Sequence, residues 1–140
     1  MIVLDTSGLL AAIDGSQRQH VEAAAAIRAS SGPLLLSPFV LAELDCLLTT
    51  RVSQEAALAL LGQVAAGAYR LETMAADDIA RASEIIVKYR DLQIGITDAS
   101  LVVLAERHGT LDVLTLDERH FRAITGPGGH PFRILPADDR

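Results

Sequence analysis

Short runs rich in apolar residues alternate along this chain with longer stretches in which apolar residues recur every three or four positions. The short runs predict strands, and their continuous apolar character is typical of a parallel sheet that is covered on both faces. The longer stretches predict helices. Strands are expected at residues 2–4, 34–36, 68–71, 111–116 and 132–135, the last of them at an edge of the sheet.

Residues that start and stop helices bound the predicted helices. Ser37 and Pro38 form a good helix start, because serine accepts hydrogen bonds at the N-cap and proline suits the first helical position. Thr97 is expected to cap another helix that Gly109 closes, and residues 6–8 are expected to form a turn. Helices are predicted at residues 9–13, 19–30, 38–50, 53–66, 76–89, 98–108 and 117–124.

Strands that alternate with helices predict an α/β fold with a parallel sheet and right-handed crossovers. The length of 140 residues, without repeats or low-complexity linkers, favours one domain over residues 1–140. In such sheets the functional crevice lies beyond the C-terminal ends of the strands, where the strand order reverses. Polar residues at those ends are therefore the first candidates for a site.

Composition and charge narrow the class of protein. Half of the residues are hydrophobic but only 4% are aromatic, which predicts an aliphatic core. The net charge of −6 argues against a protein that holds nucleic acid through a generally basic surface, but it is compatible with a nuclease whose acids lie at a metal site. Cys46, the single cysteine, is expected to fill the core. Without a signal peptide or an apolar run near the ~20 residues that span a bilayer, we expect a cytoplasmic protein with no membrane contact.

Four acidic residues stand where an apolar element meets a turn or lies against one. Asp5 and Asp117 each end a predicted strand. Asp98 opens a predicted helix, and Glu43 lies inside one among apolar neighbours. Carboxylates are rarely buried without a partner, and a hard divalent cation is the simplest partner for such a cluster.

Each acid also has a purely structural explanation. Asp5 can be a solvated turn residue, and either Asp98 or Asp117 can support a helix N-terminus. Glu43 has apolar residues three and four positions away on both sides, but Asp45 is nearly as enclosed. Helical periodicity therefore does not choose between these last two acids.

Other residues add little independent chemistry. Thr115 alternates with Asp117 along the predicted strand, so both side chains are expected to face the same side. Arg119 and His120 either contact phosphate or are solvated. The four histidines are scattered without the spacing of a zinc site, and no phosphate-binding loop or serine-hydrolase elbow is present.

The segments that carry the four acids resemble the motifs of PIN-domain nucleases, and together they span almost the whole chain. The short length is similar to that of VapC-type toxins of bacterial toxin–antitoxin pairs. The match selects Glu43 rather than Asp45. The matching segments are Met1–Ser7, Ser37–Leu44, Ile96–Ala99 and Leu114–Asp117, with Phe121 after the last.

The resemblance implies a three-layer α/β/α domain with a parallel sheet of four or five strands in the order 3-2-1-4-5. It implies an endoribonuclease that depends on Mg²⁺ or Mn²⁺. Ser7 and Thr115 are expected to support the acids from behind, and for Thr115 an ordinary β-branched strand residue is the alternative. The implied RNA target is transfer RNA or the sarcin–ricin loop of ribosomal RNA, with the ribosomal loop favoured. The implied metal-binding and catalytic residues are Asp5, Glu43, Asp98 and Asp117.

The same resemblance implies a homodimer that a VapB-type antitoxin inhibits. Apolar segments at residues 9–13, 41–48 and 58–61 are expected to form a groove for a helix of that antitoxin. Two other hypotheses remain open at this point. One is a housekeeping PIN nuclease in RNA processing, and the other is an acidic binding module without catalysis.

Overall fold

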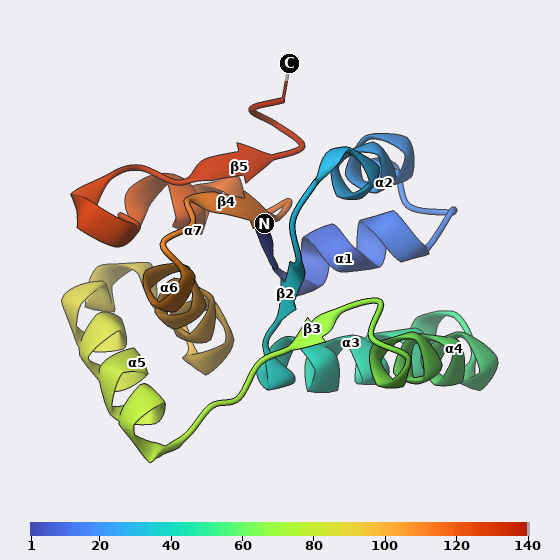
Figure 1. Ribbon diagram of the computed structural model, residues 1–140, viewed down its shortest axis with the longest axis horizontal. Helices are drawn as coiled ribbons and strands as arrows, with labels where there is room; N and C mark the ends of the chain where they lie inside the picture. Colours follow the sequence, from blue (N-terminus) through green and yellow to red (C-terminus); the bar gives the residue numbers. More distant parts are fainter. Residues whose placement is uncertain (140) are drawn as a thin grey trace.

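The computed structural model describes residues 1–139 and contains one parallel sheet of five strands (Figure 1). The strand order is β3-β2-β1-β4-β5, which confirms the expected order 3-2-1-4-5. Val3 of the central strand pairs with Leu35 on one side and Val113 on the other. The strands are β1 (Ile2–Leu4), β2 (Leu34–Leu36), β3 (Arg70–Leu71), β4 (Asp112–Leu114) and β5 (Arg133–Leu135).

Helices connect every pair of consecutive strands. The α-helices are α1 (Thr6–Ile13), α2 (His20–Ala29), α3 (Pro38–Arg51), α4 (Gln54–Ala65), α5 (Ala76–Lys88), α6 (Ile96–His108) and α7 (Glu118–Ala123). Residues 1–139 also contain two short 3₁₀ helices, η1 (Arg90–Leu92) and η2 (Pro127–Gly129). None of the helices within residues 1–139 is both long enough and apolar enough to cross a membrane.

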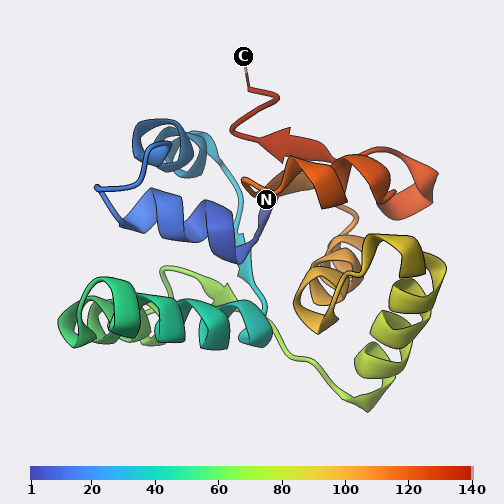
Figure 2. The same ribbon diagram turned by 180° about the vertical axis from the view of Figure 1, so that it is seen from behind.

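The helices form a layer on each face of the sheet. In Figure 1, α1 to α4 lie to the right of the sheet and α5 to α7 to the left, and Figure 2 shows the same division from behind. Right-handed crossovers explain the division, because the chain moves along the sheet in one direction from β1 to β3 and then returns through β4 to β5. The order reverses beside β1, so a crevice is expected where β1 and β4 end.

The core is aliphatic, as predicted. β1 is wholly buried, and α6 has an unbroken buried run from Ala99 to Ala105 because it packs between β1 and α5. The aromatic exception is an edge-to-face pair of Phe121 and Phe132, whose ring centroids are 5.8 Å apart. Elements that end at the crevice are therefore held rigidly by the core.

Two helices begin earlier than the sequence predicted. Residues 6–8 form the first turn of α1 rather than a separate turn, because the carboxylate of Asp5 caps this helix. α6 begins at Ile96 with Gly95 at the cap position, so the prediction that Thr97 caps the helix was wrong. As a result, Ser7 lies within α1 and Asp98 lies within the first turn of α6, so both side chains are held by a helix.

β4 is shorter than predicted and ends at Leu114. The next residue, Thr115, accepts a hydrogen bond from the backbone N–H of Asp117, with the two atoms 2.9 Å apart. This side chain-to-backbone bond replaces further sheet pairing and turns the chain. Thr115 and Asp117 therefore follow the strand instead of alternating along it.

Cys46 is exposed, so the expectation that it fills the core was wrong. The buried stripe of α3 consists of Val40, Leu44 and Leu48, which recur every four residues. Cys46 lies two positions from this stripe in either direction along the chain, which places it on a different side of the helix. Apolar neighbours in the sequence did not reveal which side of the helix faces the core.

Gly8→Ala should destabilise the protein, because a Cβ at this position of α1 would lie 2.4 Å from the carbonyl oxygen of Leu114. We expect a loss of about 2–3 kcal/mol in the free energy of unfolding, measured with urea. Gly62→Ala is the matched control, since a Cβ in this part of α4 meets nothing within 4 Å. The control should stabilise by about 0.5–1 kcal/mol through helix propensity, and equal effects of the two variants would contradict the close approach of α1 to β4.

Candidate active site

The four predicted acids line one cavity of about 400 Å³ at the C-terminal ends of β1 and β4. Asp5 follows β1, Glu43 lies on α3, Asp98 on α6, and Asp117 precedes α7. A second cavity of about 330 Å³ shares the first three of these acids. Asp45 lines neither cavity, so of these two acids on α3 only Glu43 lies with Asp5 and Asp98.

Asp5 is the most tightly held of the acids. Only 6% of its surface is exposed, and its Oδ1 accepts a hydrogen bond from the Thr6 backbone N–H at 2.8 Å. Its Oδ2 accepts hydrogen bonds from the hydroxyls of Thr115 at 2.7 Å and Ser7 at 3.3 Å. Burial nevertheless raises the pKa of Asp5 above its ordinary value, and the charge of Asp117 adds to this effect.

The hydroxyls of Ser7 and Thr115 also organise the turn after β4. Ser7 Oγ accepts the backbone N–H of Leu116 at 3.0 Å, and it lies 3.3 Å from Thr115 Oγ1. Both hydroxyls therefore hold Asp5 on one side and the chain that leads to Asp117 on the other. Both hydroxyls contact Asp5, but Thr115 does so from the turn after β4 and not from a strand, so the expected strand geometry was wrong.

Asp98, Asp117 and His120 form the most compact group of the site, with one ligand atom from each within 4.8 Å of the others. His120 Nδ1 lies 2.9 Å from Asp117 Oδ2 and 3.2 Å from Asp98 Oδ2. Asp117 is the N-cap of α7, where its Oδ1 accepts the backbone N–H of His120 at 3.2 Å. The cap thus places the imidazole between the two carboxylates.

The sequence suggested for His120 only a phosphate contact or a solvated side chain, and not a place in this group. Its spacing of three residues from Asp117 on a predicted helix was the available signal, because such residues share one side of a helix. That signal could not show that Asp98, from a different helix, would complete the group.

The environment of Asp98 disfavours its charged form. Burial is the largest cause and raises the pKa of Asp98 to about 6, and the nearby charges of Asp5 and Asp117 act in the same direction. His120 acts in the opposite direction, because a positive imidazolium favours the carboxylate. Without a cation, this group of acids therefore repels itself.

Glu43 lies at the exposed rim of the cavity, outside the compact group. Its Oε2 accepts a hydrogen bond of 2.5 Å from the hydroxyl of Thr97, which orients the carboxylate toward α6. Beneath this contact, the buried hydroxyls of Ser37 and Ser100 lie 2.8 Å apart and join the start of α3 to α6. These two contacts hold Glu43 near Asp98.

The donor atoms fit a divalent cation. Carboxylate oxygens are the ligands that Mg²⁺ prefers, and imidazole nitrogen together with carboxylates also suits Mn²⁺. Burial and repulsion both raise the pKa values of Asp5 and Asp98, and a bound cation would offset them by favouring the charged carboxylates. The cluster of Asp98, Asp117 and His120, with Asp5 beside it, is therefore a candidate metal centre.

Asp98→Asn should stabilise the metal-free protein at neutral pH. Because folding raises the pKa of Asp98 to about 6, the folded state binds this proton more tightly, and the stability contribution of Asp98 falls as pH rises between about 4 and 6. Solvent reaches part of the side chain, so we expect a gain of about 1–2 kcal/mol at pH 7 and none below about pH 4. Urea unfolding in EDTA measures the difference, and a variant less stable than the wild type at pH 7 would contradict the repulsion.

Comparisons with known proteins agree on one family. A profile of the PIN domain matches residues 2–127. The chain is 44% identical over 135 residues to Ribonuclease VapC26 of Mycobacterium tuberculosis. This match covers 96% of this chain and 100% of that protein.

Solved structures share the fold. VapC20 of Mycobacterium tuberculosis, described as a sarcin–ricin loop cleaving toxin, superposes with a TM-score of 0.77 at 24% identity, over 84% of this chain and 90% of that chain. VapBC2 of Rickettsia felis, bound to a DNA fragment from its promoter, has a TM-score of 0.68 at 18% identity, over 96% of this chain and 99% of that chain. The profile match and the sequence identity, together with this shared fold, show that the chain is a VapC-like member of the PIN-domain family.

Proposed function

We propose that this protein is an endoribonuclease that depends on Mg²⁺ or Mn²⁺ and serves as the toxin of a VapBC-type toxin–antitoxin pair. The observation that carries the proposal is the group of acids from β1, α3, α6 and α7 around one cavity. The 44% identity to a protein named as a ribonuclease supports the same reaction. A purely structural explanation of the acids does not account for four carboxylates placed where they repel one another.

Asp98 and Asp117 would hold the metal, with His120 and Asp5 beside it. When bound, a divalent ion makes a coordinated water more acidic and stabilises negative charge on the phosphoryl oxygens. The hydrogen bonds from Thr115 and Ser7 keep the Asp5 carboxylate from rotating out of the cavity. The protein thus supplies carboxylates that are already in position before a substrate arrives.

We propose that Glu43 acts as the general base. It lies at the rim of the cavity, where Thr97 orients its carboxylate through one oxygen. A carboxylate held within hydrogen-bond reach of a water can take its proton as that water attacks phosphorus. A role for Glu43 as a metal ligand through water is the alternative within the same mechanism.

The proposed substrate is structured RNA. VapC20, whose fold this chain shares, is described as cleaving the sarcin–ricin loop, which makes this loop the first RNA to test. Transfer RNA is the second. Mapping the new RNA ends after induced expression of the toxin identifies the target directly.

The proposed partner is a VapB-type antitoxin that binds a homodimer. The predicted groove is only partly available, because Leu9 and Leu10 of α1 and Leu44 of α3 are buried in the core. α4 instead leaves Leu58 and Leu61 exposed, at 58% and 39% of their surface. We propose that this apolar side of α4, beside α3, receives the antitoxin helix.

Glu43→Gln and Asp98→Asn should each lower RNA cleavage by at least about 100-fold, because each removes a charge that acts only at the reacting centre. Asp45→Asn is the matched control, since Asp45 lies on α3 beside Glu43 but lines neither cavity. The control should retain full activity. Cleavage is measured with purified protein and Mn²⁺ or Mg²⁺, and thermal melts verify folding.

EDTA should abolish cleavage by the wild type, and added Mn²⁺ should restore it. Full activity in EDTA would overturn the metal-dependent mechanism. Loss of activity in Asp45→Asn equal to that in Glu43→Gln would mean that the cavity is wrongly assigned.

Expression of the toxin should arrest growth, and co-expression of the small gene adjacent to it should relieve the arrest. Leu58→Asp should weaken binding of that gene product by at least about tenfold, because it places a charge in an apolar contact. Val21→Asp is the control, because Val21 is also apolar and 70% exposed but lies on α2 and not on α4. This variant should bind the gene product as the wild type does. A harmless protein without such a partner would favour the housekeeping nuclease instead.

A further inference from the structure

We propose that Arg51 binds a phosphate of the RNA next to the one that is cleaved, and so positions the strand in the active site. The inference rests on the proposed ribonuclease function. Arg51 is the last residue of α3 and lines the same cavity as the four acids. No other arginine or lysine within residues 1–139 lines this cavity.

The spacing along α3 places Arg51 away from the reacting centre. Glu43, Leu47 and Arg51 line the cavity at intervals of four residues, so they follow one another along one side of the helix. The rise of the helix puts Arg51 about 12 Å from Glu43 along its axis. Leu10 and Gln17 line the cavity with them. The cavity therefore extends from the carboxylates toward a guanidinium group.

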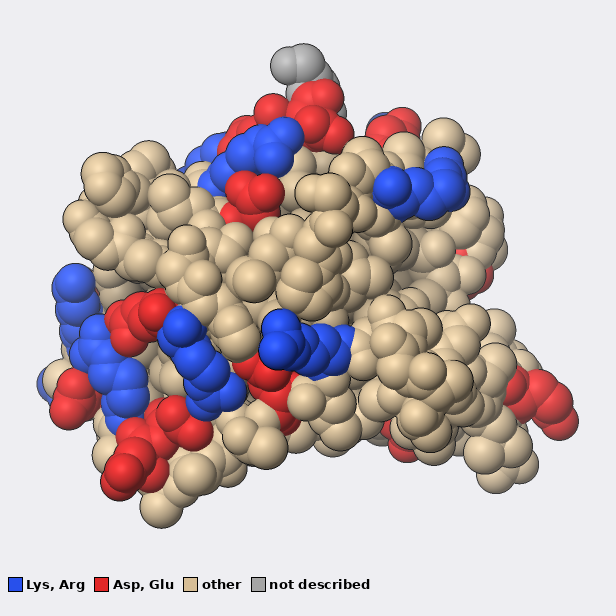
Figure 3. All heavy atoms as spheres, viewed as in Figure 1, with Lys and Arg blue, Asp and Glu red and all other residues tan. Residues whose placement is uncertain are grey.

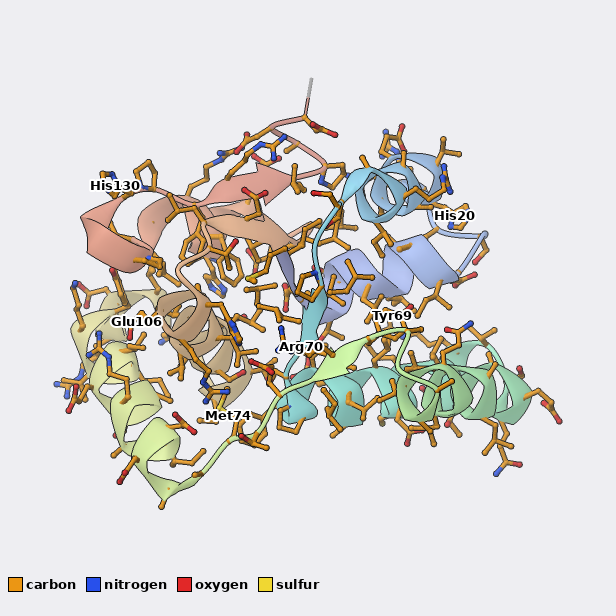
Figure 4. The ribbon with its side chains drawn as sticks, in the orientation of Figure 1. His20, Tyr69, Arg70, Met74, Glu106 and His130 are labelled. Carbon is orange, nitrogen blue, oxygen red and sulfur yellow. The ribbon has the colours of Figure 1, made fainter. Side chains whose placement is uncertain are left out.

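The charge of Arg51 has no carboxylate partner within residues 1–139. In the described part of the chain, five other arginines form ion pairs with carboxylates. Some of these pairs appear in Figure 3 as interleaved blue and red groups at the lower left. Figure 4 labels Arg70 on β3 and Glu106 on α6, two members of these networks. Arg51 forms no ion pair with any residue in the range 1–139, although four acids line the same cavity.

A free guanidinium near an acidic centre suits a polyanionic substrate. Guanidinium binds phosphate through two parallel hydrogen bonds, which fix both distance and orientation. With a net charge of −6, the protein repels RNA as a whole, so a local cation is needed beside the acids. Its distance from Glu43 assigns Arg51 to a phosphate that does not react. Arg51 is therefore a positioning residue rather than a catalytic one.

Arg51 also has a structural explanation, because a positive charge in the last turn of a helix interacts favourably with the helix dipole. Arg28 provides the matched control. It lies in the last turn of α2, is exposed, and forms no ion pair within the described chain, but it does not line the cavity. If each arginine interacts only with its helix dipole, Arg51→Ala and Arg28→Ala should have the same effect on RNA binding.

The test is fluorescence anisotropy with a labelled single-stranded RNA of mixed sequence and about 12 nucleotides, in Mg²⁺ and at roughly 50 to 200 mM salt. Such a probe is suitable because phosphate contacts carry no sequence information. All variants are compared in an Asp98→Asn background, which prevents cleavage. Arg51→Ala should weaken binding about tenfold and reduce the slope of log K against log salt by about 0.7, the loss of one phosphate contact.

Arg51→Lys should recover most of the salt slope, because it retains the charge, and Arg28→Ala should match the parent protein. In the active background, Arg51→Ala should raise KM about tenfold and change kcat little, as expected for a residue that binds substrate and transition state alike. A helix-dipole role would change only the melting temperature.

Two results would overturn the proposal in distinguishable ways. If the wild type cleaves RNA while Arg51→Ala and Arg28→Ala bind alike with the same salt slope, Arg51 does not contact phosphate and the ribonuclease assignment stands. If the wild type neither binds the probe nor cleaves RNA, the proposed function and the role of Arg51 both fail. Melting curves for each variant show that the comparison is made between folded proteins.

Discussion

Repulsion between carboxylates at the ends of β1 and β4 is the constraint on which the rest of the structure depends. Two unit charges about 5 Å apart repel by roughly 3 kcal/mol at an effective dielectric of 20, and several acids share this cavity. Burial is the main reason that the pKa values of Asp5 and Asp98 are raised, and the charges of the neighbouring acids raise them further. His120 between Asp98 and Asp117 relieves part of this repulsion, and a divalent cation would relieve more. The aliphatic core must hold together a site that opposes its own assembly.

The core does so by fixing each acid to a rigid element. β1 is wholly buried, and Asp5 follows it directly. Asp98 lies in the first turn of α6, directly before the buried run of that helix. The hydroxyls of Ser7 and Thr115 connect Asp5 to the chain after β4, so the Asp5 carboxylate cannot move independently of that turn. Rigid support of this kind lets a site keep a geometry that favours a ligand over the empty state.

Much of this arrangement could be predicted from local patterns. The short apolar runs located all five strands, although β3 and β4 are shorter than expected. The strand order came from the resemblance to PIN domains and not from periodicity, because pairing between distant strands leaves no local signature. The start of α1 was misplaced by three residues and the start of α6 by two, since capping depends on where a side chain points. Periodicity did not separate Glu43 from Asp45, which differ only in the neighbours that the fold brings to them.

The sequence by itself determined the class of fold, the aliphatic core and the position of acids at the ends of apolar elements, because each depends on residues close together in the chain. Only the tertiary structure decided which side chains meet. Thr97 and Glu43 are 54 residues apart, and their hydrogen bond exists only because α3 and α6 pack together. The tertiary structure also leaves Cys46 exposed on α3, and it places His120 of α7 between two carboxylates. Such contacts depend on the relative placement of whole elements, which the core as a whole determines.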